Sequence, residues 1–457
     1  MQRPFNFLGA ILWLLAAASS PRPLQAEDWP RLGGPAGRGC SSETGVARAW
    51  PDEGPAVLWS VAVGSGFAGP AVFDGRVYLL DREADRADVL RCFDLENGRE
   101  LWREVTDAPG KLEYDGSRNV PTVTDDAIFT VGPFGHFRCY DRATHALRWS
   151  HHLVDDFKDP EIDRIEEPQT RADTLARAQL PRWGMTQAPL IVNDLVIVAP
   201  QTQRIGLVAF DRATGVIRWQ SGYIGRNWYS HVSPTFMTLD GVPQVIMLAQ
   251  PSDPEKSPAK APPAIVSSVD PANGRILWTA QTPQPHKIPI AQPLQIGPDR
   301  LFITGGYTQG CLLLRVRRAA GEWQTEVLRS DNSVAGHIQA PVLYRDRVYV
   351  MSTRSQGADK SGLVCLAPDG NYLWQTGPEL QFHDGPLLIV DGLALAMQGR
   401  IGELHLFDLA TSPANLLAKA RALAAKNRMA WAPMAFSRGR LFVRDDQDLK
   451  CLDLRRR

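Results

Sequence analysis

The 457-residue sequence has no excess of charge of either sign, since 50 Lys and Arg residues balance 50 Asp and Glu residues. A protein that follows the phosphates of DNA or RNA needs a basic patch or stripe. No segment of this chain has that composition. We therefore expect no nucleic-acid partner.

Long hydrophobic runs are also missing, apart from one stretch near the N-terminus. Residues 7–18 are apolar and follow Arg3, which is typical of a secretory signal and short for a membrane span. We predict a signal segment over residues 1–26, cleavage before Glu27, and a periplasmic or secreted protein without a transmembrane span after cleavage. An uncleaved anchor is the alternative. No Cys follows the stretch closely enough for lipid attachment.

Cysteine is scarce, with six residues of which none are adjacent. Four occupy one equivalent position of a repeat: Cys92, Cys139, Cys365 and Cys451. Other copies carry Ala209 or Ser268 there, so the position is a small buried space. Equivalent positions of neighbouring repeats should lie beyond the Cα separation of about 7 Å that a disulfide tolerates. We predict that these residues and Cys311 serve packing, while Cys40 lies outside the repeats.

Common catalytic signatures are absent. The sequence has no G-x-S-x-G, H-E-x-x-H or Walker motif, which would supply a nucleophile, a zinc site or a phosphate cradle. Residues 270–274 form a repeat turn and not a calcium loop. No catalytic residue and no metal ligand set is therefore predicted from motifs.

The sequence contains a motif that recurs at residues 92–102, 139–149, 209–219 and 268–278, with a degenerate copy at 365–374. An apolar strand ends at Asp, a turn contains Gly or Asn, and a second strand ends at Trp. Asp bonds turn amides, Gly adopts positive φ, and Trp fills the gap between packed sheets. The structural positions are Asp94, Trp102, Asp141, Trp149, Asp211, Gly215, Trp219, Asp270, Gly274, Trp278 and Trp374.

A proline followed by two short strands precedes each hairpin. The prolines are Pro70, Pro121, Pro189, Pro234, Pro293, Pro341, Pro386 and Pro433. Eight units of four short antiparallel strands predict an all-β, eight-bladed β-propeller. The strand over 56–62 should complete the last blade and so remove the open edge. In the fifth unit we assign the repeat tryptophan to Trp323, and in the seventh unit residues 415–418 should form the outer strand.

The recurring Asp-to-Trp hairpin and the proline that precedes each unit together make the chain resemble the PQQ-like propeller repeat family over residues 50–457. The segment 28–35 (Asp-Trp-Pro-Arg-Leu-Gly-Gly-Pro) resembles the leader of exported PQQ-like propellers. The resemblance implies one of two activities. Quinoprotein alcohol dehydrogenases hold pyrroloquinoline quinone (PQQ) and Ca²⁺ at the channel mouth, whereas the outer-membrane protein assembly factor BamB binds partners without a cofactor.

Residues just before the inner-strand prolines should face one entrance of the channel. The candidates for ligand binding are Arg118, Asn119, Trp183, Gln187, His231, His337, Gln339, His383, Asp384 and Trp431. This set holds three histidines and one carboxylate, with Glu113 and Asp115 close by in sequence. Such residues either form hydrogen bonds with main-chain groups at the strand ends or form a ligand site. A Ca²⁺–quinone site or a His-bound transition metal is less favoured, because hard oxygen ligands are few and the histidines are not closely spaced.

We divide the chain into the signal segment 1–26, an N-terminal extension over 27–50 and the propeller over 51–457. A charged insertion over 151–182 between blades two and three contains a predicted helix at 170–180, and residues 251–263 form a Pro-rich loop. The leading interpretation is a monomeric, non-catalytic exported binding or scaffold protein without cofactor. Its partner is expected to be another exported or envelope protein, or a polysaccharide. A dehydrogenase dependent on PQQ and Ca²⁺ is the alternative.

Overall fold

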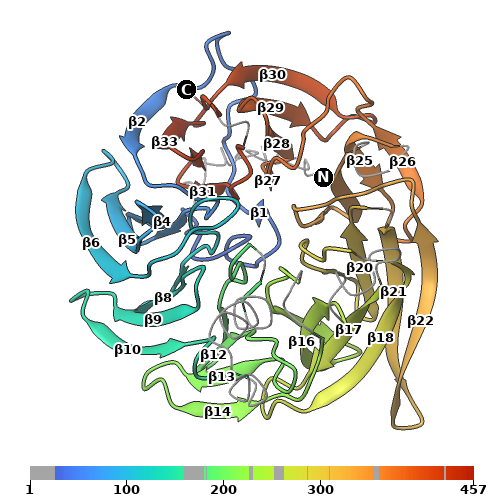
Figure 1. The fold of residues 1–457 in the computed structure, drawn as a ribbon. Helices are drawn as coiled ribbons and strands as arrows, with labels where there is room; N and C mark the ends of the chain where they lie inside the picture. The colour runs from blue at the N-terminus through green and yellow to red at the C-terminus, as the bar shows by residue number, and fades with distance from the viewer. Residues whose placement is uncertain are drawn as a thin grey trace, which may run out of the picture.

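Eight antiparallel sheets surround a central axis in the computed structural model (Figure 1). The structure describes residues 26–158, 180–181, 183–225, 230–251, 262–285, 287–307, 309–353, 360–426 and 429–456. Most of the predicted signal segment (residues 1–25), most of the predicted helix (residues 170–179) and most of the Pro-rich loop lie outside these residues. Within the described part every regular element is a strand, and no helix there could cross a membrane.

Each blade has four antiparallel strands, which in the first seven blades run in chain order from the axis outward. The first four blades comprise β3 (Ala71–Phe73), β4 (Arg76–Glu83), β5 (Ala87–Asp94) and β6 (Glu100–Asp107); β7 (Thr122–Val123), β8 (Ala127–Val131), β9 (His136–Asp141) and β10 (Leu147–His152); β11 (Leu190–Val192), β12 (Leu195–Val198), β13 (Val208–Asp211) and β14 (Ile217–Gln220); β15 (Thr235–Leu239), β16 (Val242–Ala249), β17 (Pro263–Val269) and β18 (Ile276–Pro285).

The remaining blades complete the ring, and the predicted fold is confirmed. They comprise β19 (Leu294–Ile296), β20 (Arg300–Gly305), β21 (Gly310–Ala319) and β22 (Glu322–Asp331); β23 (Val342–Tyr344), β24 (Arg347–Ser352), β25 (Gly362–Leu366) and β26 (Tyr372–Gln375); β27 (Leu387–Val390), β28 (Leu393–Gln398), β29 (Glu403–Asp408) and β30 (Asn415–Arg421); β31 (Ala435–Ser437), β32 (Arg440–Arg444), β33 (Asp448–Asp453) and β2 (Val57–Ala62).

The eighth blade joins the two ends of the propeller. Strand β2 pairs antiparallel with β33, and Trp59 lies opposite Cys451. The predicted closing strand is therefore confirmed, as is the predicted outer strand of blade seven, since β30 pairs with β29. Closure removes the exposed edges that an open array would leave.

The repeat turn behaves as its residues predict. Oδ1 of Asp211 accepts hydrogen bonds from the main-chain N–H groups of Ala213 and Thr214 at 3.1 and 2.9 Å and from Oγ1 of Thr214 at 3.0 Å. These bonds lower the pKa of Asp211. Gly215 follows at φ 73°, in the left-handed region where glycine has no steric penalty.

The repeat tryptophans link neighbouring blades. Nε1 of Trp219 donates to the carbonyl oxygen of Pro271 in the next blade at 3.0 Å. A Cβ on Gly274 of that turn would lie 2.6 Å from the Trp219 ring, so the ring and the glycine are in direct contact. Trp149 makes the same contact with Gly215, which gives the turn glycine a packing role as well as a conformational one.

Blade five departs from the prediction. Trp323 lies at the start of β22, opposite Arg318, far from the bulge beside which the tryptophans of other blades sit. Arg329 takes that position, next to the register shift at Leu313/Leu314, and its Cδ would lie 2.8 Å from a Cβ on Gly370. The assignment of Trp323 as the repeat tryptophan is therefore wrong, because the longer β21–β22 hairpin moves it away from the blade contact.

The cysteines of the repeat occupy the predicted space. Cys92 lies opposite Trp102 and Cys365 opposite Trp374, and all six cysteines of the chain are free thiols. Burial raises the pKa of the Cys92 thiol to about 12, so this thiol stays protonated and unreactive at neutral pH.

Peptide mapping of the exported protein without reductant should therefore recover Cys92, Cys139, Cys365 and Cys451 as unlinked thiols. Replacing all four with Ala should leave the map of other peptides unchanged. A disulfide to any of them would contradict the packing role, because each is held in a separate blade.

The N-terminal extension has a defined path that its sequence did not predict. Trp29 pairs with Val72 of β3 through two hydrogen bonds of 2.8 Å, and β1 (Cys40–Ser41) pairs parallel with β27 as a fifth strand of blade seven. Between these contacts the segment crosses the middle of the ring (Figure 1). The segment lies at the end of the inner strands that is farther from the prolines. It therefore gives the channel a floor, opposite the mouth at the proline end.

Candidate ligand site at the channel mouth

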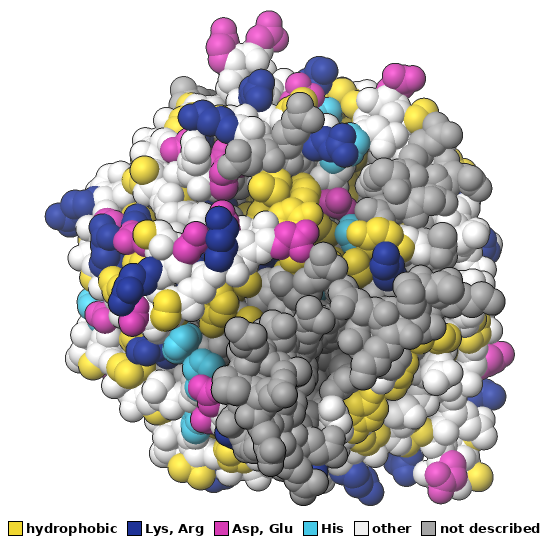
Figure 2. Space-filling model, viewed as in Figure 1, with side chains coloured by type: hydrophobic (Ala, Val, Ile, Leu, Met, Phe, Trp, Pro, Cys, Tyr) yellow, Lys and Arg dark blue, Asp and Glu magenta, His cyan; other side chains and the backbone are white. Residues whose placement is uncertain are grey.

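The predicted mouth residues surround a cavity of about 490 Å³. Eight of the ten candidates line it: Arg118, Trp183, His231, His337, Gln339, His383, Asp384 and Trp431. Each comes from a loop that joins the outer strand of one blade to the inner strand of the next. Apolar side chains gather near the centre of this face, beside basic and acidic groups (Figure 2).

Asn119 and Gln187 do not line the cavity. Asn119 is 1% exposed, and its Nδ2 donates to the carbonyl oxygens of Val131 and Met185. Gln187 is 5% exposed and donates to Oε1 of Gln201 and to the Ser230 carbonyl oxygen. Both side chains therefore hold loops together beneath the site. For these two residues the structural role holds, which was the alternative to ligand binding in the sequence analysis.

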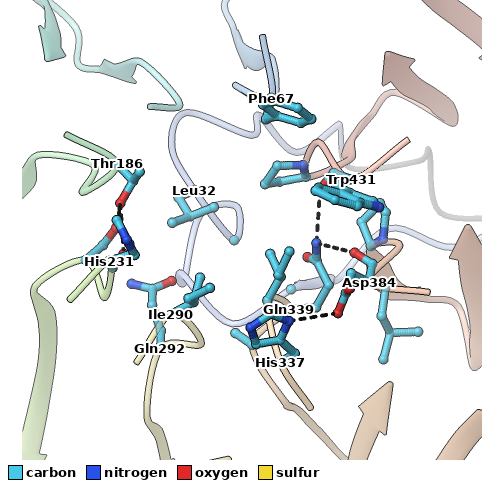
Figure 3. Close-up of a pocket in the computed structure, with 18 of the residues that line it drawn as sticks. Leu32, Phe67, Thr186, His231, Ile290, Gln292, His337, Gln339, Asp384 and Trp431 are labelled. Atoms are coloured by element: carbon cyan, nitrogen blue, oxygen red, sulfur yellow. Dashed lines mark hydrogen bonds and ion pairs between the residues drawn. The ribbon is translucent and has the colours of Figure 1, made fainter. Parts of the chain in front are cut away.

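Aromatic rings form one wall of the cavity. Trp431 stacks on Phe67 with ring centroids 5.7 Å apart (Figure 3). Tyr114 lies 6.1 Å from Trp431 and 6.4 Å from Trp183, and Trp183 lies 5.3 Å from the ring of His231. The rings thus make a continuous surface across several blades, with room for a flat apolar group.

A group of polar side chains lies beside Trp431 (Figure 3). Nδ1 of His337 lies 3.3 Å from Oδ1 of Asp384. Gln339 donates from Nε2 to the carbonyl oxygens of Asp384 and Trp431 at 3.1 and 3.0 Å. Because Gln339 holds both neighbouring loops, it fixes the distance between the acidic group and the aromatic wall.

His231 is neutral at neutral pH. Burial, with smaller contributions from the nearby Arg118 and His337, lowers its pKa to about 3. Its Nδ1 lies 2.9 Å from Oγ1 of Thr186. Among the described residues, Nε2 of His231 and Nε1 of Trp431 are buried without a hydrogen-bond partner. Buried polar atoms of this kind normally find a partner, so a polar ligand group or water would suit both.

The charge of the described part of the lining is positive. Among the described residues, Arg38, Arg118 and Arg400 line the cavity with one carboxylate, that of Asp384. Arg118 donates to the main-chain carbonyl oxygens of Gly116 and Tyr114 and lies 5.5 Å above the Phe67 ring. Burial lowers its pKa to about 10, although the nearby Asp115 carboxylate raises it, so the guanidinium is charged at neutral pH.

Several lining residues were missed by sequence reasoning. The rule that residues before an inner-strand proline face the mouth would have found Phe67 before Pro70 and Gln292 before Pro293. No such rule covers the floor, to which the N-terminal segment contributes Trp29, Leu32, Gly33, Gly37, Arg38 and Gly39. The floor depends on contacts between distant parts of the chain, which a single sequence does not reveal.

The described part of the lining does not fit Ca²⁺ with PQQ. Ca²⁺ takes six to eight oxygen ligands, mainly carboxylates and carbonyls, and the described lining residues offer one carboxylate, which is paired with His337. Within the described residues no group of three His, Cys, Asp or Glu side chains is placed to hold a metal ion. Glu113 instead accepts a hydrogen bond from Nε1 of Trp183 at 3.0 Å.

Solved structures share this architecture at low sequence identity. A europium-containing methanol dehydrogenase superposes with a TM-score of 0.63 at 13% identity, over 91% of this chain and 89% of that chain. BamB from Moraxella catarrhalis gives 0.56 at 14%, over 88% and 98%. The quinohemoprotein alcohol dehydrogenase from Comamonas testosteroni gives 0.63 at 12%, over 93% and 80%. At these identities the likeness concerns the fold alone.

Sequence comparison gives a family. No curated protein matches the chain, but the family model described as outer membrane protein assembly factor BamB matches residues 85–335 and 262–445. Together these matches cover residues 85–445, which make up most of the propeller. With the repeat turns, the blade-linking tryptophans and the closed ring of eight blades, they show that the chain belongs to the PQQ-like β-propeller family.

Proposed function

We propose that this protein is an exported, non-catalytic binding module that holds a segment of another exported or envelope protein in its channel mouth. The observation that carries the proposal is the lining of the cavity, which joins a continuous aromatic wall to the Arg118 guanidinium and, among the described residues, offers one carboxylate. Trp, Tyr and Arg are the residues that most often dominate the energy of protein interfaces.

The expected ligand is a chain segment that presents a flat apolar side chain and an acidic group. The apolar side chain would lie on Trp431 and Tyr114, and the acidic group would approach Arg118. The N-terminal segment lines the cavity as its floor and would limit how far the ligand segment can enter. The apolar stretch over residues 7–18 supports export, as does the membership of a family whose matching model is described as an outer-membrane assembly factor.

Replacing Trp431 with Ala should weaken binding of acidic, aromatic-containing peptides by about 30-fold, the effect of removing a side chain worth about 2 kcal/mol at an interface. Titration of a panel of acidic and neutral peptides and of acidic and neutral oligosaccharides measures this. Trp323→Ala is the matched control, because Trp323 lies on β22 at the outer edge, and it should leave affinity unchanged.

Binding of oligosaccharides in place of peptides would overturn the choice of partner. Equal affinities of the Trp431 and Trp323 variants would overturn the choice of site. The quinone alternative has its own test, a thermal melt with and without PQQ plus Ca²⁺. We expect no shift, whereas a ligand at 100 times its dissociation constant would stabilise the protein by about 2.7 kcal/mol, and such a shift would favour a dehydrogenase.

A further inference from the structure

Glu43 is a buried carboxylate at the junction of the first and last blades. Its side chain is 3% exposed. Oε1 accepts from the main-chain nitrogen of Glu27 at 2.9 Å and from that of Arg438 at 2.7 Å, and Oε2 accepts from that of Gly439 at 2.7 Å. In the described part of the chain, no ion pair joins it to a Lys, Arg or His side chain. A buried charge without an opposite charge is unfavourable.

One of the three donors lies at the predicted cleavage point. Cleavage before Glu27 would turn the Glu27 main-chain nitrogen from a neutral amide into a charged α-amino group. This nitrogen already lies 2.9 Å from the carboxylate, which is the separation of a charge-assisted hydrogen bond. Ala26 is exposed, so the bond to be cut lies at the surface.

Other contacts fix the position of Glu27. Its own Oε2 accepts from Oγ of Ser41 at 2.9 Å and from the nitrogen of Ser42 at 2.8 Å. The next residue, Asp28, accepts from the nitrogen of Asp74 at 3.0 Å. The nitrogen is therefore held in place by its neighbours and does not rely on the Glu43 contact alone.

We infer that Glu43 is the binding site for the α-ammonium group of a chain processed between Ala26 and Glu27. Hydrolysis of that peptide bond by an export endopeptidase adds water: the hydroxyl goes to the Ala26 carbonyl carbon and the hydrogen to the Glu27 nitrogen. At neutral pH the products are a carboxylate on the released leader and an ammonium on Glu27. The ammonium neutralises the buried Glu43 charge, which an unprocessed chain cannot do.

Processing thereby completes the ring. The Arg438–Gly439 turn connects β31 to β32 of blade eight, while Asp28 and Trp29 bind β3 and its turn in blade one. The ion pair thus connects the last blade to the segment that lies on the first and that forms the floor of the cavity. This inference does not depend on the proposed ligand.

The experiment compares chains that begin at Glu27 and at Ala26. Both carry an α-amino group, but in the second it is displaced by one residue. At pH 7 the Glu27 chain should melt higher by about 3 °C or more, since breaking a buried pair is strongly destabilising. Glu43→Gln in both chains should reduce the difference between them to near zero.

The pH dependence has a definite sign. Pairing raises the pKa of the Glu27 α-amino group above its unfolded value of about 8. The extra stability is therefore fully present below that value and is lost as pH rises through the folded-state pKa. Glu27, Asp28, Glu43, Asp74 and Arg438 face this contact in both chains. A change in the melting difference between the two chains from pH 6 to pH 10 therefore reports the α-amino group.

Equal melting temperatures of the two chains would overturn the inference, as would a difference that survives Glu43→Gln, or an intact mass of the exported protein that starts elsewhere than Glu27. If the Gln variant does not fold, acylation of the α-amino group at pH 7 decides the question. The rate should be at least about 10-fold slower for the Glu27 chain, and equal rates would contradict the ion pair.

Discussion

Replacing Trp219 with Ala should lower the free energy of unfolding by about 3–5 kcal/mol, the range for removal of a large buried aromatic side chain. Trp219 is 7% exposed and packs in a cluster that includes Ala209, Val245 and Val269. The change also leaves the Pro271 carbonyl oxygen without its 3.0 Å hydrogen bond. Denaturant unfolding followed by circular dichroism measures the loss.

The control is Trp323→Ala, the same substitution at a position away from the register shift beside which Trp219 packs. Trp323 is only partly buried at the edge of a core cluster, and its ring lies 5.8 Å from the guanidinium of Arg318. We expect a smaller loss than at Trp219, because less of the side chain is buried. A loss below 1 kcal/mol at Trp219 would show that this tryptophan does not link blades three and four.

Replacing Arg82 with Leu should destabilise the protein by about 3–5 kcal/mol, because it leaves a buried carboxylate unpaired. Nη1 of Arg82 lies 2.7 Å from Oδ1 of Asp88, and the two side chains are 1% and 3% exposed. Nη2 also donates to the carbonyl oxygens of Ala108 and Gly110. Burial raises the pKa of Asp88 to about 6 in spite of the arginine.

Two comparisons make this result specific. Arg103→Leu on strand β6 of the same blade removes exposed contacts with Glu83 and Glu100, and should change stability by less than about 1 kcal/mol. The double change Arg82→Leu with Asp88→Leu should be less destabilising than Arg82→Leu alone, because no buried charge remains. A double variant as unstable as the sum of the single changes would mean that the two side chains do not act as a pair.

Most of the fold could be predicted because each blade is built from local contacts. The Asp211 turn, the glycine at 215 and the tryptophan at 219 lie within one short segment, and each has a recognisable chemical requirement. The closing strand was predictable as well, since a strand with a tryptophan and no partner matched a last blade that lacked one. The prediction for blade five was wrong because Arg329, and not a tryptophan, packs against the turn glycine of the next blade.

The candidate site was predictable only in part. The prolines marked the ends of the inner strands, and so located Trp431, His337 and Asp384 at one mouth. The same marker placed Asn119 and Gln187 there, but one step along a strand turns a side chain from the channel into the packed sheet. Exposure, and not sequence position, separated ligand-facing residues from those that hold loops together.

The sequence by itself determined the number of blades, the order of their strands and the closure of the ring, because these follow from short-range turns and from a repeat that must pack on its neighbours. The tertiary structure alone decided the path of the N-terminal segment, the floor of the cavity and the partners of Glu43. Glu43 and Gly439 are 396 residues apart in the chain. Such a contact exists only after the ring has closed, and no local pattern encodes it.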